Sequence, residues 1–279
     1  MKYLVVCILF CTTLLSAQER IVALSPAINE ILFALGKGSE VVGNTTYATY
    51  PEAAKKIPKV GGYFSVSLEK ILALKPTLVL MQKNNLSLKP KLERLGIKTA
   101  LVKISSLHDL EEGIVKIGKL THTEPKAKQI VSQIETSLQE LKGILKDKKI
   151  LIVFGANYDL NREIFVSGNN LYFADIIRAS GNQNAFNEQS NKQPMLSLEG
   201  ILALNPDIVY ILAHRVHAKK TEALITPWLK LPITAARAKT VYVTTEKYAG
   251  MPSQRVVLFI HDFKEILQDA KRKFAALRD

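Results

Sequence analysis

The sequence predicts an α/β fold of two doubly wound, Rossmann-like lobes joined by one long helix, with a ligand cleft between the lobes. Three observations predict this architecture. Short apolar runs typical of buried parallel strands alternate with helical segments along the chain. One helix-to-strand passage occurs twice, as SLEKILALKPTLVLM from residue 67 and as SLEGILALNPDIVYI from residue 197, an offset of 130 residues. A single long amphipathic segment lies between the two copies.

The first 17 residues predict a secretory signal peptide. In MKYLVVCILFCTTLLSA, Lys2 precedes an uncharged apolar run that ends in small residues and is too short to span a membrane. Both cysteines, Cys7 and Cys11, lie in this segment, and the bulky Phe10 stands where a lipid-anchoring cysteine normally has a small neighbour. We therefore expect a periplasmic protein that is not lipid-anchored. After cleavage it has no thiol for disulfides, metal ligation or nucleophilic catalysis.

The first lobe is predicted to span residues 18–122. The run RIVAL supplies a buried strand at 21–24, after which Ser25 suits a helix N-cap, Pro26 the first helical position and Gly36 the helix exit. The segment VVG predicts the next strand. In the first copy of the repeat, a serine cap and about two helical turns lead through a proline into the apolar strand TLVLM. The segment LGIKTALVKI repeats that helix-to-strand pattern.

A single helix over residues 123–147 is predicted to connect the lobes. Its apolar residues recur every three or four positions, which keeps them on one stripe of a helix. Thr123 suits the N-cap and Pro125 the first turn. Because a helix of about 20 residues is about 30 Å long and packs along both lobes, we expect only modest closure on ligand binding. The apolar residues of the stripe are Ile130, Ile134, Leu138, Leu141 and Leu145.

The second lobe is predicted to span residues 148–279. It begins with the strand KKILIVFG and the helix NLYFADIIRASG, which Gly181 closes, and continues with the second copy of the repeat. The strand KTVYVT and an amphipathic helix over 254–277 complete it. Loops and helix N-termini converge at the carboxyl ends of strands in such lobes. The sequence therefore predicts a binding site between the two lobes.

The chain is basic, with a formal net charge of +13, but the charge is spread. It falls in short groups such as KKIPK, KDKK and KRK rather than in one dense block, which indicates a solvated surface. Together with export, this distribution argues against a nucleic-acid partner. A basic surface still favours anionic ligands or lipid headgroups. We expect the protein to be a monomer.

Motifs for catalysis are missing from the sequence. It contains no nucleophile elbow, no phosphate-cradling glycine loop and no metalloprotease motif. No carboxylate–histidine cluster has the spacing of a site for a bare metal ion. These patterns predict a binding protein rather than an enzyme, with no cofactor of its own. An exported enzyme is the alternative of a different class, and turnover of a small molecule would support it.

Several segments carry a resemblance to a known family. SPAINEILFALG, VVGNTTYATYPEA and VGGYFSVSLEKILALKPTLVL resemble the exported solute-binding proteins of ABC importers for metal chelates. These are the periplasmic binding proteins with a helical backbone, and the resemblance is closest to cobalamin-binding members. In the second lobe, SLEGILALNPDIVYI and MPSQR resemble the matching helix and turn, although MPSQR departs from the usual turn sequence.

The resemblance implies a role for the acid that both copies of the repeat carry. Glu69 and Glu199 match family positions at which one glutamate in each lobe pairs with arginines of the membrane permease dimer. Such charged contacts set register and encounter rate. A simpler account is also open, because a carboxylate in the first turn of a helix is stabilised by the helix dipole.

The resemblance also implies a set of ligand-binding residues and a metal chelate as the transported ligand. A large chelate needs apolar rings with a few polar tips, which tyrosine supplies; packing of the loops onto the lobes is the alternative role for these aromatics. A corrinoid such as cobalamin is the first expectation, although cobalamin-binding members have tryptophans where this chain has Tyr63 and Gln193. The residues are Tyr47, Tyr50, Tyr63 and Phe64 in the first lobe and Phe165, Gln193 and Tyr248 in the second.

Two other chelates fit the same class of importer. Haem-binding members use a tyrosinate near the position of Tyr63 as an iron ligand, and the motif HRVH places His214 and His217 just after a strand of the second lobe. Ferric siderophores are the other alternative. Their negative charge would call for a cation such as Arg215, Arg255 or Lys247.

Overall fold

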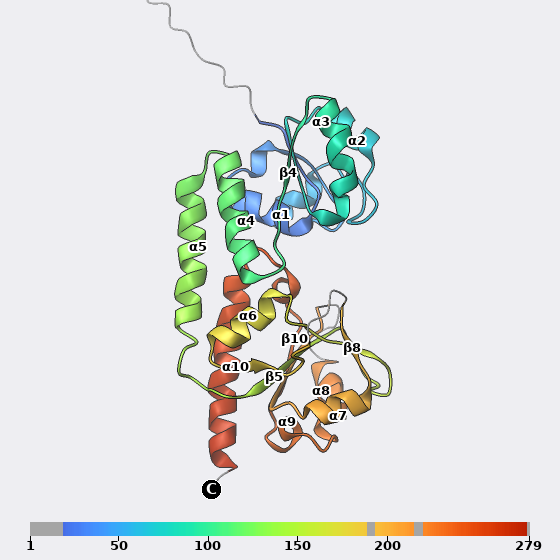
Figure 1. The fold of residues 1–279 in the computed structure, drawn as a ribbon. Coiled ribbons are helices and arrows are strands. Elements are labelled where there is room, and N and C mark those ends of the chain that lie inside the picture. Colours follow the sequence, from blue (N-terminus) through green and yellow to red (C-terminus); the bar gives the residue numbers. More distant parts are fainter. Residues whose placement is uncertain (1–18, 189–192, 215–219, 278–279) are drawn as a thin grey trace, which may run out of the picture.

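The computed structural model describes residues 19–188, 193–214 and 220–277 and confirms the two-lobed α/β fold (Figure 1). Each lobe contains a four-stranded parallel sheet, ordered β2-β1-β3-β4 in the first lobe and β10-β9-β5-β7 in the second. When the strands of each four-stranded sheet are numbered in chain order within that sheet, both sheets have the order 2-1-3-4. The strands are β1 (Ile21–Ala23), β2 (Val41–Asn44), β3 (Leu78–Met81), β4 (Lys98–Leu101), β5 (Lys149–Phe154), β7 (Gln183–Asn184), β9 (Ile208–Leu212) and β10 (Val241–Thr244).

Helices surround the two sheets, and a small two-stranded sheet, β6-β8, flanks the second lobe. The first lobe contains α1 (Pro26–Ala34), α2 (Leu68–Ala73), α3 (Lys89–Arg94) and α4 (Leu107–Leu120), with short 3-10 segments at Gly38–Glu40, Glu52–Lys56 and Lys83–Leu88. The second lobe contains β6 (Ile164–Phe165), α6 (Tyr172–Ala179), β8 (Met195–Leu196), α7 (Leu198–Leu204), α8 (Thr221–Leu229), α9 (Thr234–Arg237), the 3-10 segment Lys247–Gly250 and α10 (Val256–Ala276). The predicted signal peptide lies outside the described residues.

The duplicated passage forms the same structure in both lobes. Helices α2 and α7 are capped by the hydroxyls of Ser67 and Ser197, which accept the backbone N–H three residues later. Each helix ends just before a residue with positive φ, 46° at Lys75 and 43° at Asn205, and a proline follows. Because asparagine tolerates this left-handed conformation better than lysine, the second copy is the less strained of the two.

This difference predicts a stabilising substitution. Lys75→Asn is expected to raise the free energy of unfolding by about 0.5–1 kcal/mol, since it reduces the left-handed penalty at an exposed position. Urea denaturation followed by circular dichroism measures the change. The reverse substitution, Asn205→Lys, is the control and is expected to destabilise, because the Asn205 side chain also accepts hydrogen bonds from Thr234. A loss of stability in Lys75→Asn would contradict the prediction.

The connecting helix, α5 (Glu124–Gln139), is shorter than the predicted helix over 123–147. The chain continues in turns after Gln139, and Gly143 has φ 79°. Leu141 stays fully buried although it lies beyond the helix. The apolar spacing therefore continues past the point at which the helical conformation ends. Two predicted N-caps also differ from the structure: the hydroxyls of Ser25 and Thr123 lie at the N-cap positions of α1 and α5 but make no capping hydrogen bond.

One apolar core runs through both lobes. It includes Ile21 and Leu80 from the first sheet, Ile152 and Tyr210 from the second, and Phe259 of α10. Helices α4, α5, α6 and α10 supply much of the remainder, and Figure 1 shows α5 and α10 running along one side of the molecule. Because a close-packed core resists deformation, this continuity favours small movements of one lobe against the other.

Polar contacts also join the lobes at two places. Near α4, the backbone N–H of Leu107 donates to the Asp175 carboxylate at 2.8 Å, and the N–H of Tyr172 donates to the Ser105 carbonyl oxygen at 2.8 Å. Near α1, Glu30 forms a buried ion pair with Arg255. Its carboxylate also accepts a hydrogen bond of 2.6 Å from the Ser253 hydroxyl.

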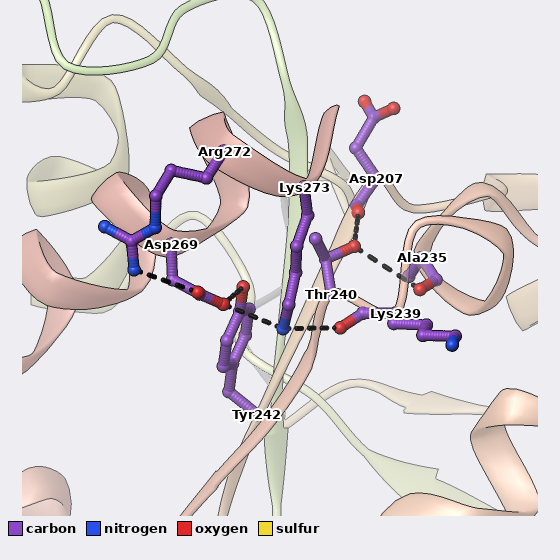
Figure 2. Close-up of polar contacts among 8 residues, drawn as sticks. All are labelled: Asp207, Ala235, Lys239, Thr240, Tyr242, Asp269, Arg272 and Lys273. Carbon is purple, nitrogen blue, oxygen red and sulfur yellow. Dashed lines mark hydrogen bonds and ion pairs between the residues drawn. The ribbon is translucent and has the colours of Figure 1, made fainter. Parts of the chain in front are cut away.

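Helix α10 is fastened to the edge strand β10 by the contacts in Figure 2. The Tyr242 hydroxyl donates to Asp269 Oδ2 at 2.8 Å, and Lys273 Nζ lies 2.7 Å from the same carboxylate. Lys273 also donates to the Lys239 carbonyl oxygen at 2.9 Å. Burial and the Asp269 carboxylate raise the pKa of Tyr242, so its hydroxyl stays a donor at neutral pH.

No helix within the described part of the chain is long and apolar enough to cross a membrane.

Candidate functional site

The main cleft forms where the carboxyl ends of strands from the two lobes face each other. One cavity of about 500 Å³ lies between the lobes, and a second of about 410 Å³ adjoins it on the first lobe. Both include Tyr63, Gln82, Ile104 and Pro252, so they are parts of one cleft. In each sheet the first and third strands are neighbours, and the chain leaves them in opposite directions. That point is where open α/β sheets bind ligands.

The strand ends explain which residues line the cleft. Ser25 follows β1, Gln82 follows β3 and Ile104 comes shortly after β4, while Phe154 and Gly155 mark the end of β5. Among the described residues that line the two cavities, none carries a charged side chain. The surface is instead aromatic and aliphatic with a few amides and hydroxyls, in a chain of net charge +13. The first cavity is lined by Tyr63, Gln82, Ile104, Ser105, Phe154, Gly155, Phe165, Leu171, Tyr172, Phe173, Gln193, Gly250 and Pro252.

Tyr63 lies where the two cavities meet, and its position is tightly held. Its hydroxyl donates a hydrogen bond of 2.6 Å to Gln82 Oε1, and the side-chain amides of Asn84 and Asn85 donate to its backbone carbonyl oxygen. Its ring meets Phe64 edge to face, with 4.7 Å between ring centroids. Burial raises the pKa of the Tyr63 phenol, so the hydroxyl is protonated at neutral pH.

Gln193 and Phe165 supply the facing wall from the second lobe. Gln193 lies four residues before the cap Ser197, as Tyr63 lies four residues before the cap Ser67, so the two are equivalent positions of the duplication. Gln193 Nε2 donates to the Val166 carbonyl oxygen at 2.6 Å. Phe165 is 45% exposed and pairs across the β6-β8 sheet with Met195.

Two further predicted residues lie on the first-lobe side of the cleft. Tyr47 and Phe64 line the second cavity and are 62% and 82% exposed, so their rings are open to a ligand. Of the seven predicted ligand-binding residues, these two and Tyr63, Phe165 and Gln193 are brought together around the cleft.

Tyr50 and Tyr248 line neither of these cavities. The ring of Tyr50 lies 3.9 Å from the Arg255 guanidinium carbon, and its carbonyl oxygen accepts from Asn29 Nδ2 at 3.0 Å. The Tyr248 hydroxyl donates to Asp262 Oδ2 at 2.7 Å, and burial raises the pKa of that phenol. Both tyrosines therefore serve contacts outside the cleft, and ligand binding by them has no support from the geometry.

Of the predicted iron ligands and cations that the structure describes, only Tyr63 lines either cavity; Arg255 and Lys247 do not. His214 is exposed in a turn after β9 and lines neither cavity, and His217 and Arg215 lie outside the described residues. Arg255 is committed to Glu30. Across residues 19–188, 193–214 and 220–277, no group of three or more His, Cys, Asp or Glu side chains is arranged to hold a metal ion.

Glu69 and Glu199 are exposed in the first turns of α2 and α7, one in each lobe. Figure 1 shows these helices on the side of the molecule away from α5. The Ser197 hydroxyl and a backbone N–H lower the pKa of Glu199, so this carboxylate is ionised at neutral pH. Both acids are therefore accessible to a partner protein.

Sequence reasoning missed several lining residues that follow strands. Gln82, Ile104 and Phe154 stand at or just after strand ends, and that position was the signal that could have found them. Tyr172 and Phe173 open helix α6 and carried no such signal. The hydrogen bond from Tyr172 to Ser105 brings them to the cleft, and it joins residues that are distant in sequence.

Comparisons with known proteins agree with this architecture. The sequence matches the family described as periplasmic binding protein over residues 21–248. The vitamin B12-binding protein of Vibrio vulnificus (strain YJ016) is 27% identical over 271 residues, which cover 95% of this chain and 96% of that protein. The uncharacterized ABC transporter substrate-binding lipoprotein YvrC of Bacillus subtilis (strain 168) is 32% identical over 219 residues, covering 75% of this chain and 68% of that protein.

A solved structure shows the same fold. The apo form of the periplasmic haem-binding protein RhuT from Roseiflexus sp. RS-1 superposes with a TM-score of 0.71 at 25% sequence identity. The match covers 91% of this chain and 99% of that one.

Proposed function

This chain belongs to the periplasmic binding protein family, and from that premise we propose that it is the substrate-binding component of an ABC importer. In this role it captures a metal chelate between its lobes and delivers it to a membrane permease dimer. We propose that residues 1–17 direct its export and that it acts in the periplasm as a monomer. The Bacillus relative is named a lipoprotein; our proposal that this chain has no lipid anchor depends on Phe10 preceding Cys11.

The ligand that the cleft suits best is a corrinoid, and the observation that carries this choice is the uncharged lining. A corrin ring has an extended apolar face and a rim of neutral amide groups. The aromatic rings of Tyr63 and Phe165 suit the face, while the amides of Gln82 and Gln193 can exchange hydrogen bonds with the rim. The Vibrio relative named as a vitamin B12-binding protein aligns over nearly the whole chain and supports the same choice.

Haem and ferric siderophores fit the lining less well. Both classes carry carboxylates or other anionic groups, which are costly to desolvate without a cation or several donors beside them. Among the described residues, no cation lines the two cavities themselves: Arg255 is paired with Glu30, and Lys83 and Lys103 line only an adjoining hollow. The Tyr63 hydroxyl already donates a hydrogen bond to Gln82 Oε1, which ligation of iron by Tyr63 would break.

Calorimetric titration with cyanocobalamin, haemin and a ferric hydroxamate siderophore tests the proposal. We expect saturable one-to-one binding of cyanocobalamin and much weaker binding of the other two. Calorimetry needs no fluorophore at the binding site; the single tryptophan, Trp228, is buried in the core of the second lobe and lines neither cavity. Binding of none of the three, or turnover of any of them, would remove the basis of the proposal.

Substitution of the cleft aromatics should weaken this binding. Phe165→Ala is expected to lower cyanocobalamin affinity by about tenfold or more, because it removes an exposed aromatic ring from the lining of the main cavity. Tyr158→Ala is the matched control, since Tyr158 is similarly exposed at 49% but lines neither cavity. Equal losses in the two variants would contradict the placement of the ligand.

The protonated state of Tyr63 gives a pH prediction. A pKa raised above the ordinary phenol value keeps the hydroxyl protonated from about pH 6 to about pH 9, so Tyr63 itself should introduce no pH dependence of cyanocobalamin affinity across that range. Comparing titrations of the wild type and Tyr63→Phe at several pH values measures this. A haemin complex whose visible spectrum changes on Tyr63→Phe would instead favour tyrosinate ligation.

A further inference from the structure

A third hollow opens from the cleft into the first lobe and differs from the cleft in charge. It has a volume of about 360 Å³ and shares Tyr63, Gln82, Ile104 and Ser105 with the main cavity. Its remaining walls come from the segments that follow β3 and β4. The full lining is Tyr63, Gln82, Lys83, Asn84, Leu101, Val102, Lys103, Ile104, Ser105 and Asp109.

Two lysines give this hollow a positive character that the main cleft lacks. Lys83 and Lys103 are exposed and come from different strand ends, and no ion pair or hydrogen bond is assigned to either ammonium among the described residues. A free ammonium is a point-like donor that suits phosphate oxygens. The two therefore form an open pair of cations in a hollow that adjoins the cleft.

The acid in the lining is already engaged. Asp109 lies in the first turn of α4, where its Oδ2 accepts the backbone N–H of Ser106 and the Ser106 hydroxyl accepts the N–H of Asp109. This reciprocal cap directs the carboxylate to the helix terminus, where the helix dipole also stabilises it. The lining then has two cations and one acid, a net charge of +1.

We propose that this hollow is a subsite for the phosphodiester of a complete corrinoid, with Lys83 and Lys103 as its partners; the proposal rests on the corrinoid function proposed above. A complete corrinoid carries a nucleotide loop on one face of its ring, and the phosphodiester of that loop is an anionic group away from the cobalt. With the ring in the uncharged cleft, the adjoining basic hollow is the matching place for that phosphate. The subsite makes the protein select complete corrinoids over precursors without the loop.

The test compares two ligands with the same corrin ring. Cyanocobalamin has the phosphodiester, whereas dicyanocobinamide lacks the entire nucleotide loop. The double variant Lys83→Gln/Lys103→Gln is expected to lower cyanocobalamin affinity by about tenfold, the scale of a hydrogen bond to a charged group, and to leave dicyanocobinamide affinity unchanged. Raising the salt concentration should likewise weaken only cyanocobalamin binding in the wild type.

A second double variant controls for net charge. Lys91→Gln/Lys98→Gln removes two exposed lysines of the same lobe that line none of the three hollows, and it is expected to change neither affinity. An equal effect of Lys83→Gln/Lys103→Gln on both ligands, or the same effect from the control, would overturn the subsite while leaving the corrinoid function standing. Binding of neither corrinoid to the wild type would overturn both proposals.

Discussion

Replacing Glu69 and Glu199 together with alanine is expected to abolish import while leaving the affinity for the ligand unchanged. Both carboxylates are exposed in the first turns of equivalent helices, and neither lines the cleft. A protein with two similar lobes can present the two acids as a pair to a two-fold symmetric permease. A desolvated charge pair at such an interface is worth about 2 kcal/mol or more when one partner is removed.

The alternative role of these glutamates predicts a small effect. In both lobes a serine already caps the helix, since Ser67 accepts from Lys70 N and Ser197 accepts from Gly200 N. The helix-dipole contribution of an exposed acid is about 0.3–1 kcal/mol. Helix stabilisation alone would therefore leave transport close to normal in the double variant.

The measurement is uptake of labelled cyanocobalamin by cells or proteoliposomes that contain the cognate permease, with calorimetry of the same variants for affinity. Each single variant is expected to reduce uptake partially, because one lobe remains docked. Glu52→Ala/Glu163→Ala is the matched control, since it removes one exposed acid from each lobe and the same total charge. Normal uptake by Glu69→Ala/Glu199→Ala would show that docking does not depend on these acids.

The repeat explains why so much of the fold could be predicted from the sequence. Local rules on caps, prolines and apolar runs identified the helix-to-strand passage twice, and the two sheets do share one strand order. The same offset relates Tyr63 to Gln193, which face one cavity from opposite lobes. Features that follow from local sequence, or from its duplication, could therefore be predicted.

Features that depend on contacts between residues distant in sequence could not be predicted from the sequence. The end of α5 at Gln139 escaped prediction because Leu141 is buried from a non-helical segment and so prolongs the apolar spacing. Tyr248 looked like a cleft residue, but Asp262 on the following helix binds its hydroxyl. Nothing in the sequence near Glu30 or Arg255 indicates that these two residues pair.

Glu30→Ala is expected to lower the free energy of unfolding by about 3–5 kcal/mol, the cost of leaving one member of a buried ion pair without its partner. Glu30 on α1 is 3% exposed, and the Arg255 side chain is 13% exposed. The Glu30 carboxylate accepts hydrogen bonds from the Arg255 guanidinium through both oxygens and a further one from the Ser253 hydroxyl. Removing it leaves the guanidinium with the ring of Tyr50 but without a countercharge.

Urea denaturation of Glu30→Ala, Arg255→Met and Glu30→Met/Arg255→Met measures this cost and separates it from simple loss of packing. The double variant is expected to be more stable than either single variant, because it buries no uncompensated charge. If the losses in free energy of unfolding of the two single variants added up in the double variant, the pairing would be contradicted. The contact joins α1 of the first lobe to the start of α10 in the second, next to cleft residues Ala27 and Pro252. Loss of this contact is therefore expected to reduce ligand affinity as well as stability, whereas Glu69→Ala/Glu199→Ala is expected to change transport alone.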